Sequence, residues 1–302
     1  MLWKFSLKSH FSYKILLQKY VAFVPTNARG MPATTAAVHE TQILDRTELA
    51  PGVVLLGFHA PELVRVTKPG QFLMAIPPNG ERPATALGVY EAEKNRASIM
   101  FFICGPRTRE LELLRPGDRF AVSGPLGNGF TIGDASHVAI VAGGVGIASV
   151  LLVAQAIVQM GKRARLFYGA RTAELLVDRE RFEDAGCEVI CATDDGSFGH
   201  HGFVTEALEQ TDEKPDLILA CGPSPMLRAT AQVARELGVP AQLSLEETFG
   251  CGVGGCWGCT VPLDRRSAQA PHFPGADAGG SDVVNARICR EGPVFWAHEL
   301  RW

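Results

Sequence analysis

Four cysteines in the C-terminal part of the chain have the types and spacing of iron–sulfur ligands. Cys251, Cys256 and Cys259 follow the pattern C-x4-C-x2-C, and Cys289 lies further along. This spacing is that of plant-type [2Fe–2S] ligation. Glycines between the cysteines allow the tight curl that such a loop needs, and their N–H groups can point at an anionic cluster. We therefore predict that these four thiolates are metal ligands.

Two other uses of the cysteines have to be compared with this one. Structural zinc usually takes two C-x(2–4)-C pairs, whereas the second half of this pattern offers only Cys289. A disulfide framework is typical of short secreted chains, and we recognise no signal peptide in these 302 residues. The eight cysteines suit a reducing compartment such as the cytoplasm. The cluster is the favoured interpretation, and zinc is the alternative.

Two short motifs in the first half of the chain could bind a phosphate. Arg82-Pro83-Ala84-Thr85 stands at the start of an expected strand, where a guanidinium can grip a pyrophosphate and a hydroxyl can donate to it. Gly105-Pro106-Arg107-Thr108 precedes a short helix expected at 109–114, and N–H groups at a helix start favour phosphate. A surface arginine before a strand is also commonplace, so neither motif identifies a ligand alone.

Glycines after an expected buried strand indicate a nucleotide site. Gly143, Gly144 and Gly146 lead into a helix, and they match only the beginning of the dinucleotide fingerprint. Cys221-Gly222 ends a later strand of the same kind, at the sheet edge where ligands of open α/β sheets bind. We expect a nicotinamide nucleotide there. Arg171 leaves the choice between NAD and NADP open, because a loop that caps a helix explains it equally well.

Secondary-structure patterns divide the body of the chain into two regions. Short strands separated by Pro-Gly turns predict an antiparallel β-barrel. They are expected at 37–44, 53–59, 72–76, 85–91, 97–103 and 119–123. Regular alternation of strands and helices then predicts a doubly wound parallel α/β domain. Its strands are expected at 138–142, 164–169, 188–192 and 217–221, and its helices at 147–160, 173–185, 204–210 and 226–237.

Composition excludes some classes of function. The chain is 46% hydrophobic and 20% charged with a net charge of -3, and its body has no basic patch that would favour nucleic acid. The uncharged run 138–161 could resemble a membrane span, but its glycines favour a strand, a turn and a buried helix. Residues 1–30 carry five basic residues and no acidic ones, which is consistent with a surface or targeting segment or with a start at Met31.

The order of barrel, α/β domain and cysteine loop resembles the ferredoxin-reductase superfamily, and most of all the electron-transfer subunit of type B dihydroorotate dehydrogenase. Thr85 stands where that family has Ser, Arg107 replaces a glycine, and Ser149 replaces a proline. The runs Gly-Pro-Leu-Gly-Asn-Gly-Phe at 124–130 and Cys-x-x-Gly-Pro-Val-Phe at 289–295 match closely. The stretch between Cys259 and Cys289 is longer than usual in the family.

The resemblance implies cofactors and domain boundaries. It implies an extension at 1–34, an FAD-binding barrel at 35–132, an NAD-binding domain at 133–240 and a [2Fe–2S] module at 241–302. FAD would contact the two phosphate motifs, and Met100, Phe101 and Phe102 would line it, although ordinary barrel core explains those three as well. Cys221 and Gly222 would lie beside the nicotinamide, and Cys289 would be the fourth cluster ligand.

The resemblance also implies a partner. Nothing in the sequence indicates a site for a carbon substrate, and no catalytic residue is assigned. Oxidation of dihydroorotate in pyrimidine biosynthesis would take place on an FMN-containing catalytic subunit, in a heterotetramer with two copies of each chain. One alternative is a subunit of a related NAD(P)H:ferredoxin or sulfide-type oxidoreductase with another partner. Another is a zinc-stapled binding module without redox activity.

Overall fold

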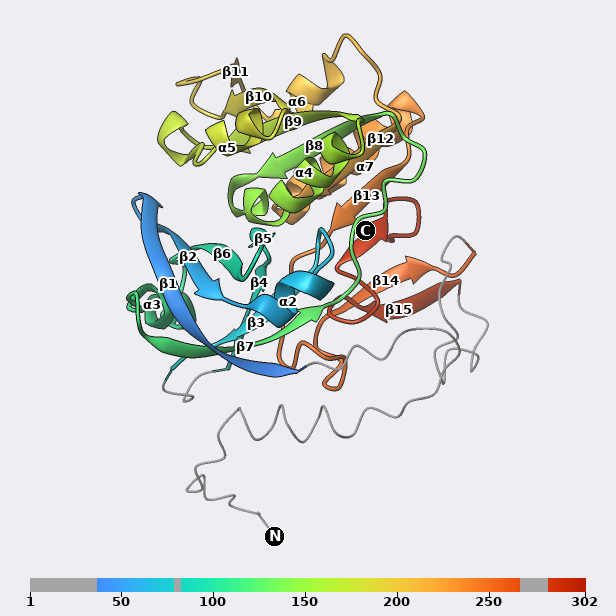
Figure 1. The fold of residues 1–302 in the computed structure, drawn as a ribbon. Helices are drawn as coiled ribbons and strands as arrows, with labels where there is room; N and C mark the ends of the chain where they lie inside the picture. The colour runs from blue at the N-terminus through green and yellow to red at the C-terminus, as the bar shows by residue number, and fades with distance from the viewer. Residues whose placement is uncertain (1–36, 79–82, 267–281) are drawn as a thin grey trace.

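The structure is a computed structural model that describes residues 37–78, 83–266 and 282–302. An antiparallel domain, an α/β domain and a small C-terminal hairpin lie against one another (Figure 1). No helix among the described residues is long and apolar enough to cross a membrane. The uncharged run after His137 is instead divided into a strand, a 3-10 helix and a short buried α-helix, as the glycines predicted.

Seven strands form the antiparallel sheet, in the order β4-β3-β7-β1-β2-β6-β5. They are β1 (Val38–Ala50), β2 (Val53–His59), β3 (Phe72–Ile76), β4 (Thr85–Gly88), β5 (Glu91–Glu93), β6 (Arg96–Phe102) and β7 (Arg119–Leu126). Two short helices, α2 (Pro61–Val66) and α3 (Pro106–Glu112), accompany the sheet. The alternation of buried apolar residues with turn signals accounts for this antiparallel domain, which confirms the predicted strand pattern.

The predicted barrel is not closed by hydrogen bonds among the described residues. The strand expected at 85–91 is divided, because Val89 N–H donates to the carbonyl of Gln71 and Tyr90 N–H donates to that of Ser98. The chain thereby passes from β4, which pairs with β3, to β5, which pairs with β6. The two edges of the sheet are thus joined by the chain itself and not by a strand ladder.

The second sheet is mixed, in the order β11-β10-β9-β8-β12-β13-β16. Its strands are β8 (His137–Gly143), β9 (Arg163–Ala170), β10 (Glu188–Thr193), β11 (His200–His201), β12 (Leu217–Cys221), β13 (Ala241–Ser244) and β16 (Val294–Trp296). All pairs are parallel except β13 with β16, which is antiparallel. The predicted parallel sheet therefore has one antiparallel edge strand, which the sequence pattern did not indicate.

Helices cover both faces of this sheet, as a doubly wound fold requires. One face carries η1 (Gly144–Ser149), α4 (Leu151–Gln159), η2 (Ala173–Leu175) and α5 (Glu180–Asp184), and the other carries α6 (Val204–Glu209) and α7 (Ser224–Leu237). Alternate residues of β8 divide between the two cores: Val138 and Ile140 face α4, whereas Ala139 and Val141 face α7. The helix expected at 173–185 is wrong, because Asp178 has a φ of 56° and interrupts it.

The C-terminal segment ties the domains together. β14 (Thr260–Asp264) and β15 (Val283–Arg287) form an antiparallel hairpin, after which the chain returns as β16 to the edge of the α/β sheet. Asn128, which follows β7, bridges to this segment: its amide nitrogen donates to the carbonyls of Val294 (2.7 Å) and Glu291 (3.1 Å), and its oxygen accepts from Val294 N–H (2.9 Å). The run at 124–130 therefore joins the C-terminal segment to the antiparallel domain.

We predict that Asn128→Ala lowers the free energy of unfolding by about 1–2 kcal/mol, because the three hydrogen bonds between the Asn128 side chain and the backbone are lost at a partly exposed site. Asn285→Ala is the matched control, since Asn285 is exposed on β15, and it should change stability by less than about 0.5 kcal/mol. Urea unfolding of both variants measures the difference. Equal effects of the two substitutions would show that the Asn128 bridge adds nothing to stability.

Candidate functional site

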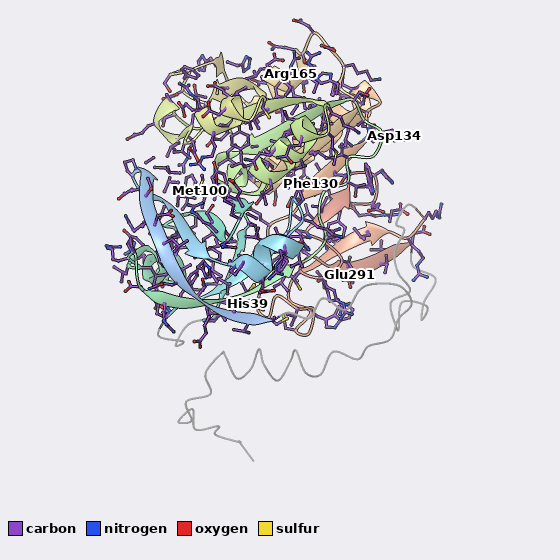
Figure 2. The ribbon with its side chains drawn as sticks, in the orientation of Figure 1. His39, Met100, Phe130, Asp134, Arg165 and Glu291 are labelled. Atoms are coloured by element: carbon purple, nitrogen blue, oxygen red, sulfur yellow. The ribbon has the colours of Figure 1, made fainter. Side chains whose placement is uncertain are left out.

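A cavity of about 880 Å³ lies where the two domains and the C-terminal segment meet. Its walls come from β4, β6 and the start of α3 on one side, and from the turns after β8, β9 and β12 on the other. Figure 2 places Met100 at this junction, and Met100 shares one buried core with η1 and α4. The cavity thus opens at the carboxyl ends of the parallel strands, where open α/β sheets bind ligands.

The motif at 82–85 contributes to the floor of the cavity. Arg82 lies outside the described residues, Pro83 is exposed, and Ala84 is buried. Thr85 lines the cavity, and its hydroxyl oxygen is buried without a hydrogen-bond partner among the described residues. An unpaired buried hydroxyl is costly, so a ligand that accepts from it or donates to it would relieve that cost.

The motif at 105–108 lies directly beside this one. Arg107 donates to the carbonyl of Ala84 at 3.0 Å, and so joins the two motifs. The Thr108 hydroxyl accepts from the N–H groups of Cys104 (3.1 Å) and Gly105 (3.2 Å), which holds the turn at the start of α3. Thr108 and Cys104 line the cavity, whereas Arg107 does not. In this structure Arg107 braces the wall of the cavity.

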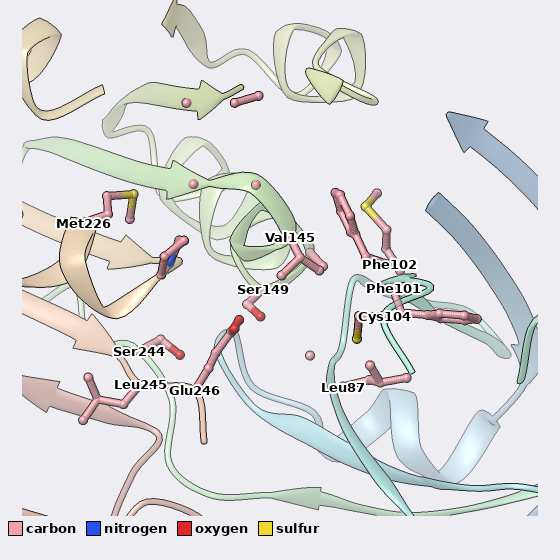
Figure 3. A pocket seen from close by; sticks show the side chains of 18 of the residues that line it. Leu87, Phe101, Phe102, Cys104, Val145, Ser149, Met226, Ser244, Leu245 and Glu246 are labelled. Carbon is pink, nitrogen blue, oxygen red and sulfur yellow. The ribbon is translucent and has the colours of Figure 1, made fainter. Parts of the chain in front are cut away.

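Three residues of β6 form the apolar side of the cavity. Met100 and Phe101 are buried, Phe102 is half-buried, and all three line the cavity. Leu87 and the labelled side chains of Phe101, Phe102 and Cys104 gather at one end of the cavity in Figure 3. This surface suits a flat aromatic ring system, which gains from apolar contact on its faces.

The two glycine motifs of the α/β domain meet behind the opposite wall. Gly143 and Gly144 line the cavity, whereas Gly146, Cys221 and Gly222 do not. A Cβ on Gly146 would lie 2.1 Å from the carbonyl oxygen of Cys221, so only glycine allows this approach. Gly222 has a φ of 155° and is in close contact with Gly143. These glycines let η1 and the turn after β12 lie against each other beside the cavity.

Glu246 is a residue of the site that the sequence reasoning missed. It lines the cavity, and its carboxylate oxygen lies 3.8 Å from the thiol of buried Cys221. In Figure 3 its side chain points toward Ser149 across the cavity. Burial by the surrounding protein raises the pKa of the Glu246 carboxyl group, although the residue is exposed on the side of the cavity. Burial, and then the charge of Glu246, raise the pKa of Cys221. The sequence after β13 contains no motif that marks Glu246 as a residue of the site.

The four cysteines of the C-terminal loop converge. The Cys289 thiol is hydrogen bonded to the sulfurs of Cys251 and Cys259, and Cys256 is hydrogen bonded to Cys251. The bond from Cys289 lowers the pKa of Cys251 to about 4 and that of Cys259 to about 6. The N–H groups of Gly255 (3.2 Å) and Cys256 (3.4 Å) point at the sulfur of Cys251. The same hydrogen bonds raise the pKa of Cys289, so negative charge is favoured on Cys251 and Cys259.

The cysteine loop packs against the antiparallel sheet beside the cavity. Within the described ranges, no group of three or more His, Cys, Asp or Glu side chains is arranged to hold a single metal ion. Phe249, one residue before the loop, lines the cavity and packs on Phe72 with ring centroids 5.0 Å apart. A Cβ on Gly252 would lie 2.5 Å from the side chain of Met74 on β3. The cysteine loop therefore lies directly against the antiparallel sheet that forms the cavity.

Similarity to known proteins agrees with this geometry. Residues 140–232 match the model of the oxidoreductase NAD-binding domain family. The dihydroorotate dehydrogenase B (NAD(+)) electron transfer subunit of Caldanaerobacter subterraneus is 35% identical, covering 77% of this chain and 86% of that protein. The subunit of that name from Desulforamulus reducens is 31% identical, covering 88% and 98%.

A solved structure shares the architecture of most of this chain. It is that of an NADH-dependent reduced ferredoxin-NADP oxidoreductase involved in flavin-based electron bifurcation. The two structures superpose with a TM-score of 0.75 at 28% identity, covering 87% of this chain and 90% of the other. The fold is therefore that of a ferredoxin reductase, with an antiparallel domain and a mixed nucleotide-binding sheet.

We predict that Glu246→Gln changes the pH dependence of stability. Because the folded-state pKa of Glu246 is raised above 4.5, the folded protein retains a proton that the unfolded chain releases. The stability that this bound proton contributes is present below the unfolded-state pKa and is lost as the pH rises through the folded-state pKa. The Gln variant does not titrate, so its melting temperature relative to the parent should increase between pH 5 and pH 8. Glu247→Gln, at the neighbouring residue of the cavity, is the control for removal of a carboxylate from this segment. A difference that stays constant with pH would contradict this account.

Proposed function

Because the chain belongs to the family of dihydroorotate dehydrogenase B (NAD(+)) electron transfer subunits, we propose that it carries electrons from a dihydroorotate-oxidising catalytic subunit to NAD. One observation supports this most: a single cavity joins the flavin-type wall, the nucleotide-type wall and the base of a four-cysteine loop. Flavin exchanges either a hydride or single electrons, so it can link a nicotinamide to an iron–sulfur cluster.

FAD is assigned to the antiparallel domain, residues 35–132. The unpaired hydroxyl of Thr85, the turn held by Thr108 and the apolar strand β6 fit a ligand with a phosphate chain and an aromatic ring. Arg82 is proposed to hold the phosphates, with Arg107 holding Ala84 in place behind them. These residues would bind and orient the flavin, while Met100, Phe101 and Phe102 would exclude water from one side of its ring.

NAD is assigned to the domain at 133–240. The family match at 140–232 supports this choice, and Gly144 at the start of η1 leaves room for a phosphate to approach the backbone, since no atom lies within 4 Å of an added Cβ there. Gly143 is instead packed on Met226, whose sulfur would lie 2.5 Å from an added Cβ. Gly146 and Gly222 keep this turn in contact with Cys221. The nicotinamide would then lie in the same cavity as the flavin, between β4 and the turn after β12.

The [2Fe–2S] cluster is assigned to Cys251, Cys256, Cys259 and Cys289 in the module at 241–302. Hydrogen bonds connect the four sulfurs in series, and backbone N–H groups point at Cys251 and Cys259. Glycines at 250 and 258 leave the sulfur of Cys256 uncrowded, since an added Cβ would lie 3.2 and 3.6 Å from it. The spacing of the four cysteines is that of plant-type [2Fe–2S] ligation, which is why a cluster is proposed here and not zinc.

The partner is proposed to be an FMN-containing catalytic subunit, two copies of each chain forming a heterotetramer in a reducing compartment. No residue of this chain is proposed to act on dihydroorotate. The cysteine loop is the surface through which the two subunits would exchange electrons: Cys256 and Trp257 are exposed, and Arg287 holds the indole ring with its guanidinium 4.5 Å from the ring centre.

A second candidate is supported by the solved structure that shares this architecture. That protein is an NADH-dependent reduced ferredoxin-NADP oxidoreductase, and the likeness covers most of both chains. In that case the same cofactors would serve a different partner, and dihydroorotate would play no part. The identity of the protein that co-purifies with this chain distinguishes the two candidates.

We predict that Thr85→Val weakens flavin binding by about tenfold, since one hydrogen bond to the ligand is lost at constant side-chain volume. Thr85→Ser keeps the hydroxyl and should retain the affinity of the parent. Titration of the apoprotein with FAD, followed by flavin fluorescence, gives the dissociation constants. If the Thr85→Val variant binds FAD as tightly as the Thr85→Ser variant does, the hydroxyl of Thr85 does not face the flavin.

We predict that the isolated chain reduces ferricyanide with NADH and leaves dihydroorotate unchanged until the catalytic subunit is added. Cys289→Ser should lose bound iron and abolish the coupled reduction of NAD by dihydroorotate, yet keep much of the ferricyanide activity, because ferricyanide can accept electrons directly from flavin. Cys187→Ala is the control, since Cys187 is buried outside the loop.

Two outcomes would contradict the proposed function. Reduction of NAD by dihydroorotate without a partner would place the substrate site on this chain. Full coupled activity and full iron content in Cys289→Ser would remove Cys289 from the ligand set.

A further inference from the structure

A chain of polar contacts crosses the interface between the antiparallel and α/β domains, outside the cavity. Tyr90 lies in the short connection between β4 and β5, and its side chain is fully buried. Its hydroxyl donates to the carboxylate of Asp178 at 2.5 Å, in the connection between η2 and α5. This bond therefore joins two domains through residues that are 88 positions apart in sequence.

Charged side chains extend this contact on both sides. Arg181 of α5 pairs with Asp178 (3.2 Å) and with Glu91 of β5. Glu91 also pairs with Arg96 at 2.9 Å, and Arg96 holds Asp45 of β1 through two bonds of 2.7 and 2.8 Å. The carboxylates of Glu91 and Asp178 are each only 16% exposed. We call Tyr90, Asp178, Arg181 and Glu91 the interdomain latch.

Each half of the latch is close in sequence to a wall of the cavity. Tyr90 is two residues after Gly88, which lines the cavity on β4, and Asp178 is three residues after Leu175, which lines the opposite side. The two walls also touch directly, because a Cβ on Gly88 would lie 2.3 Å from the hydroxyl of Ser149 in η1. A change in the latch would therefore be transmitted to the separation of the walls over two or three residues.

The backbone at Asp178 supports a functional role for the latch. A φ of 56° is uncommon for a residue other than glycine, and aspartate and asparagine tolerate it best. This conformation interrupts the helical segment after Leu175 and turns the carboxylate toward Tyr90. Backbone conformations of this kind persist where the surrounding contacts hold them, and here Tyr90 of the other domain and Arg181 of α5 both hold the carboxylate.

We infer that the interdomain latch sets the distance between the flavin and nicotinamide sites, and that Tyr90 and Asp178 are positioning residues for hydride transfer although they line neither site. This inference rests on the proposed exchange of a hydride between NADH and flavin. Transfer of this kind depends steeply on the separation of donor and acceptor, and a displacement of about 1 Å can cost up to about a hundredfold in rate. The latch holds that separation by joining the two walls at their backs.

The test uses Tyr90→Phe, Asp178→Gly and the double variant in the full chain loaded with FAD. Phenylalanine retains the buried ring, and glycine tolerates the positive φ, so each change removes the bond while allowing the same backbone conformation. The control is Thr211→Val, because the Thr211 hydroxyl accepts from Arg165 at 2.8 Å within one domain, and neither residue lines the cavity. Anaerobic rapid mixing with saturating NADH gives the rate of flavin reduction, and the long-wavelength charge-transfer absorbance reports the stacking of flavin and nicotinamide.

We expect Tyr90→Phe and Asp178→Gly each to retain one FAD per chain and to reduce flavin about tenfold more slowly, with a weaker charge-transfer band. The double variant should be no slower than the worse single variant, because both changes remove one bond. Hydrogen exchange of the apoprotein should increase at 173–181 in both single variants, which gives a readout independent of any cofactor.

Three results would overturn the inference. The first is flavin reduction and charge-transfer absorbance like those of the parent in both single variants. The second is an equal loss in Thr211→Val, and the third is independent, multiplying losses in the double variant. If the parent chain itself does not reduce flavin with NADH, the proposed function fails, and that outcome is distinct from a failure of the latch.

Discussion

The contact between Phe72 and Phe249 is the packing interaction on which the arrangement of the site depends. Phe72 begins β3 of the antiparallel sheet. Phe249 follows the last parallel strand of the α/β sheet and lies just before the cysteine loop. Their rings lie 5.0 Å apart at the edge of the cavity, a separation usual for favourable aromatic pairs. Because this pair connects the two domains at the cavity wall, the cysteine loop has to lie beside the flavin-type site.

Close approaches of the backbone supply the rest of the geometry. Gly146 lies against the carbonyl of Cys221, Gly88 against Ser149, and Gly252 against Met74, and in each place a Cβ would come within 2.6 Å of a neighbouring atom. These three glycines come from three different segments, yet each brings one wall of the cavity or the loop close to another. Larger residues would separate the walls, so these glycines limit how far apart the three binding sites can be.

Much of the architecture could be predicted from the sequence, because local signals are strong there. Proline–glycine turns divided the antiparallel strands, and apolar runs interrupted by Gly143 and Gly144 marked the start of the nucleotide-binding sheet. The cysteine spacing predicted four ligands in a loop where hydrogen bonds connect the four sulfurs, and their role as cluster ligands stays a prediction. Predictions failed where distant contacts decide the outcome. The helix at 173–185 is interrupted at Asp178, whose carboxylate is held by Tyr90 of another domain, and no local pattern could show that bond.

The site was predicted less completely than the fold for the same reason. Thr85, Thr108 and the residues of β6 line the cavity, but Gly146, Cys221 and Gly222 lie behind its wall, and Arg82 lies outside the described residues. Glu246 carries no motif, and it is recognised only because the fold places it opposite Ser149 and next to Cys221. Edge strand β16 was missed because three residues give too short a pattern to predict a strand.

The central claim is that one chain holds a two-electron and a one-electron centre around a single cavity. Anaerobic reductive titration of the purified chain, followed by visible absorption and electron paramagnetic resonance, tests it most directly. The account predicts that each chain accepts three electrons, two on flavin and one on a [2Fe–2S] cluster with a signal that is lost in Cys251→Ser. Uptake of only two electrons, with a colourless zinc-containing loop, would contradict it.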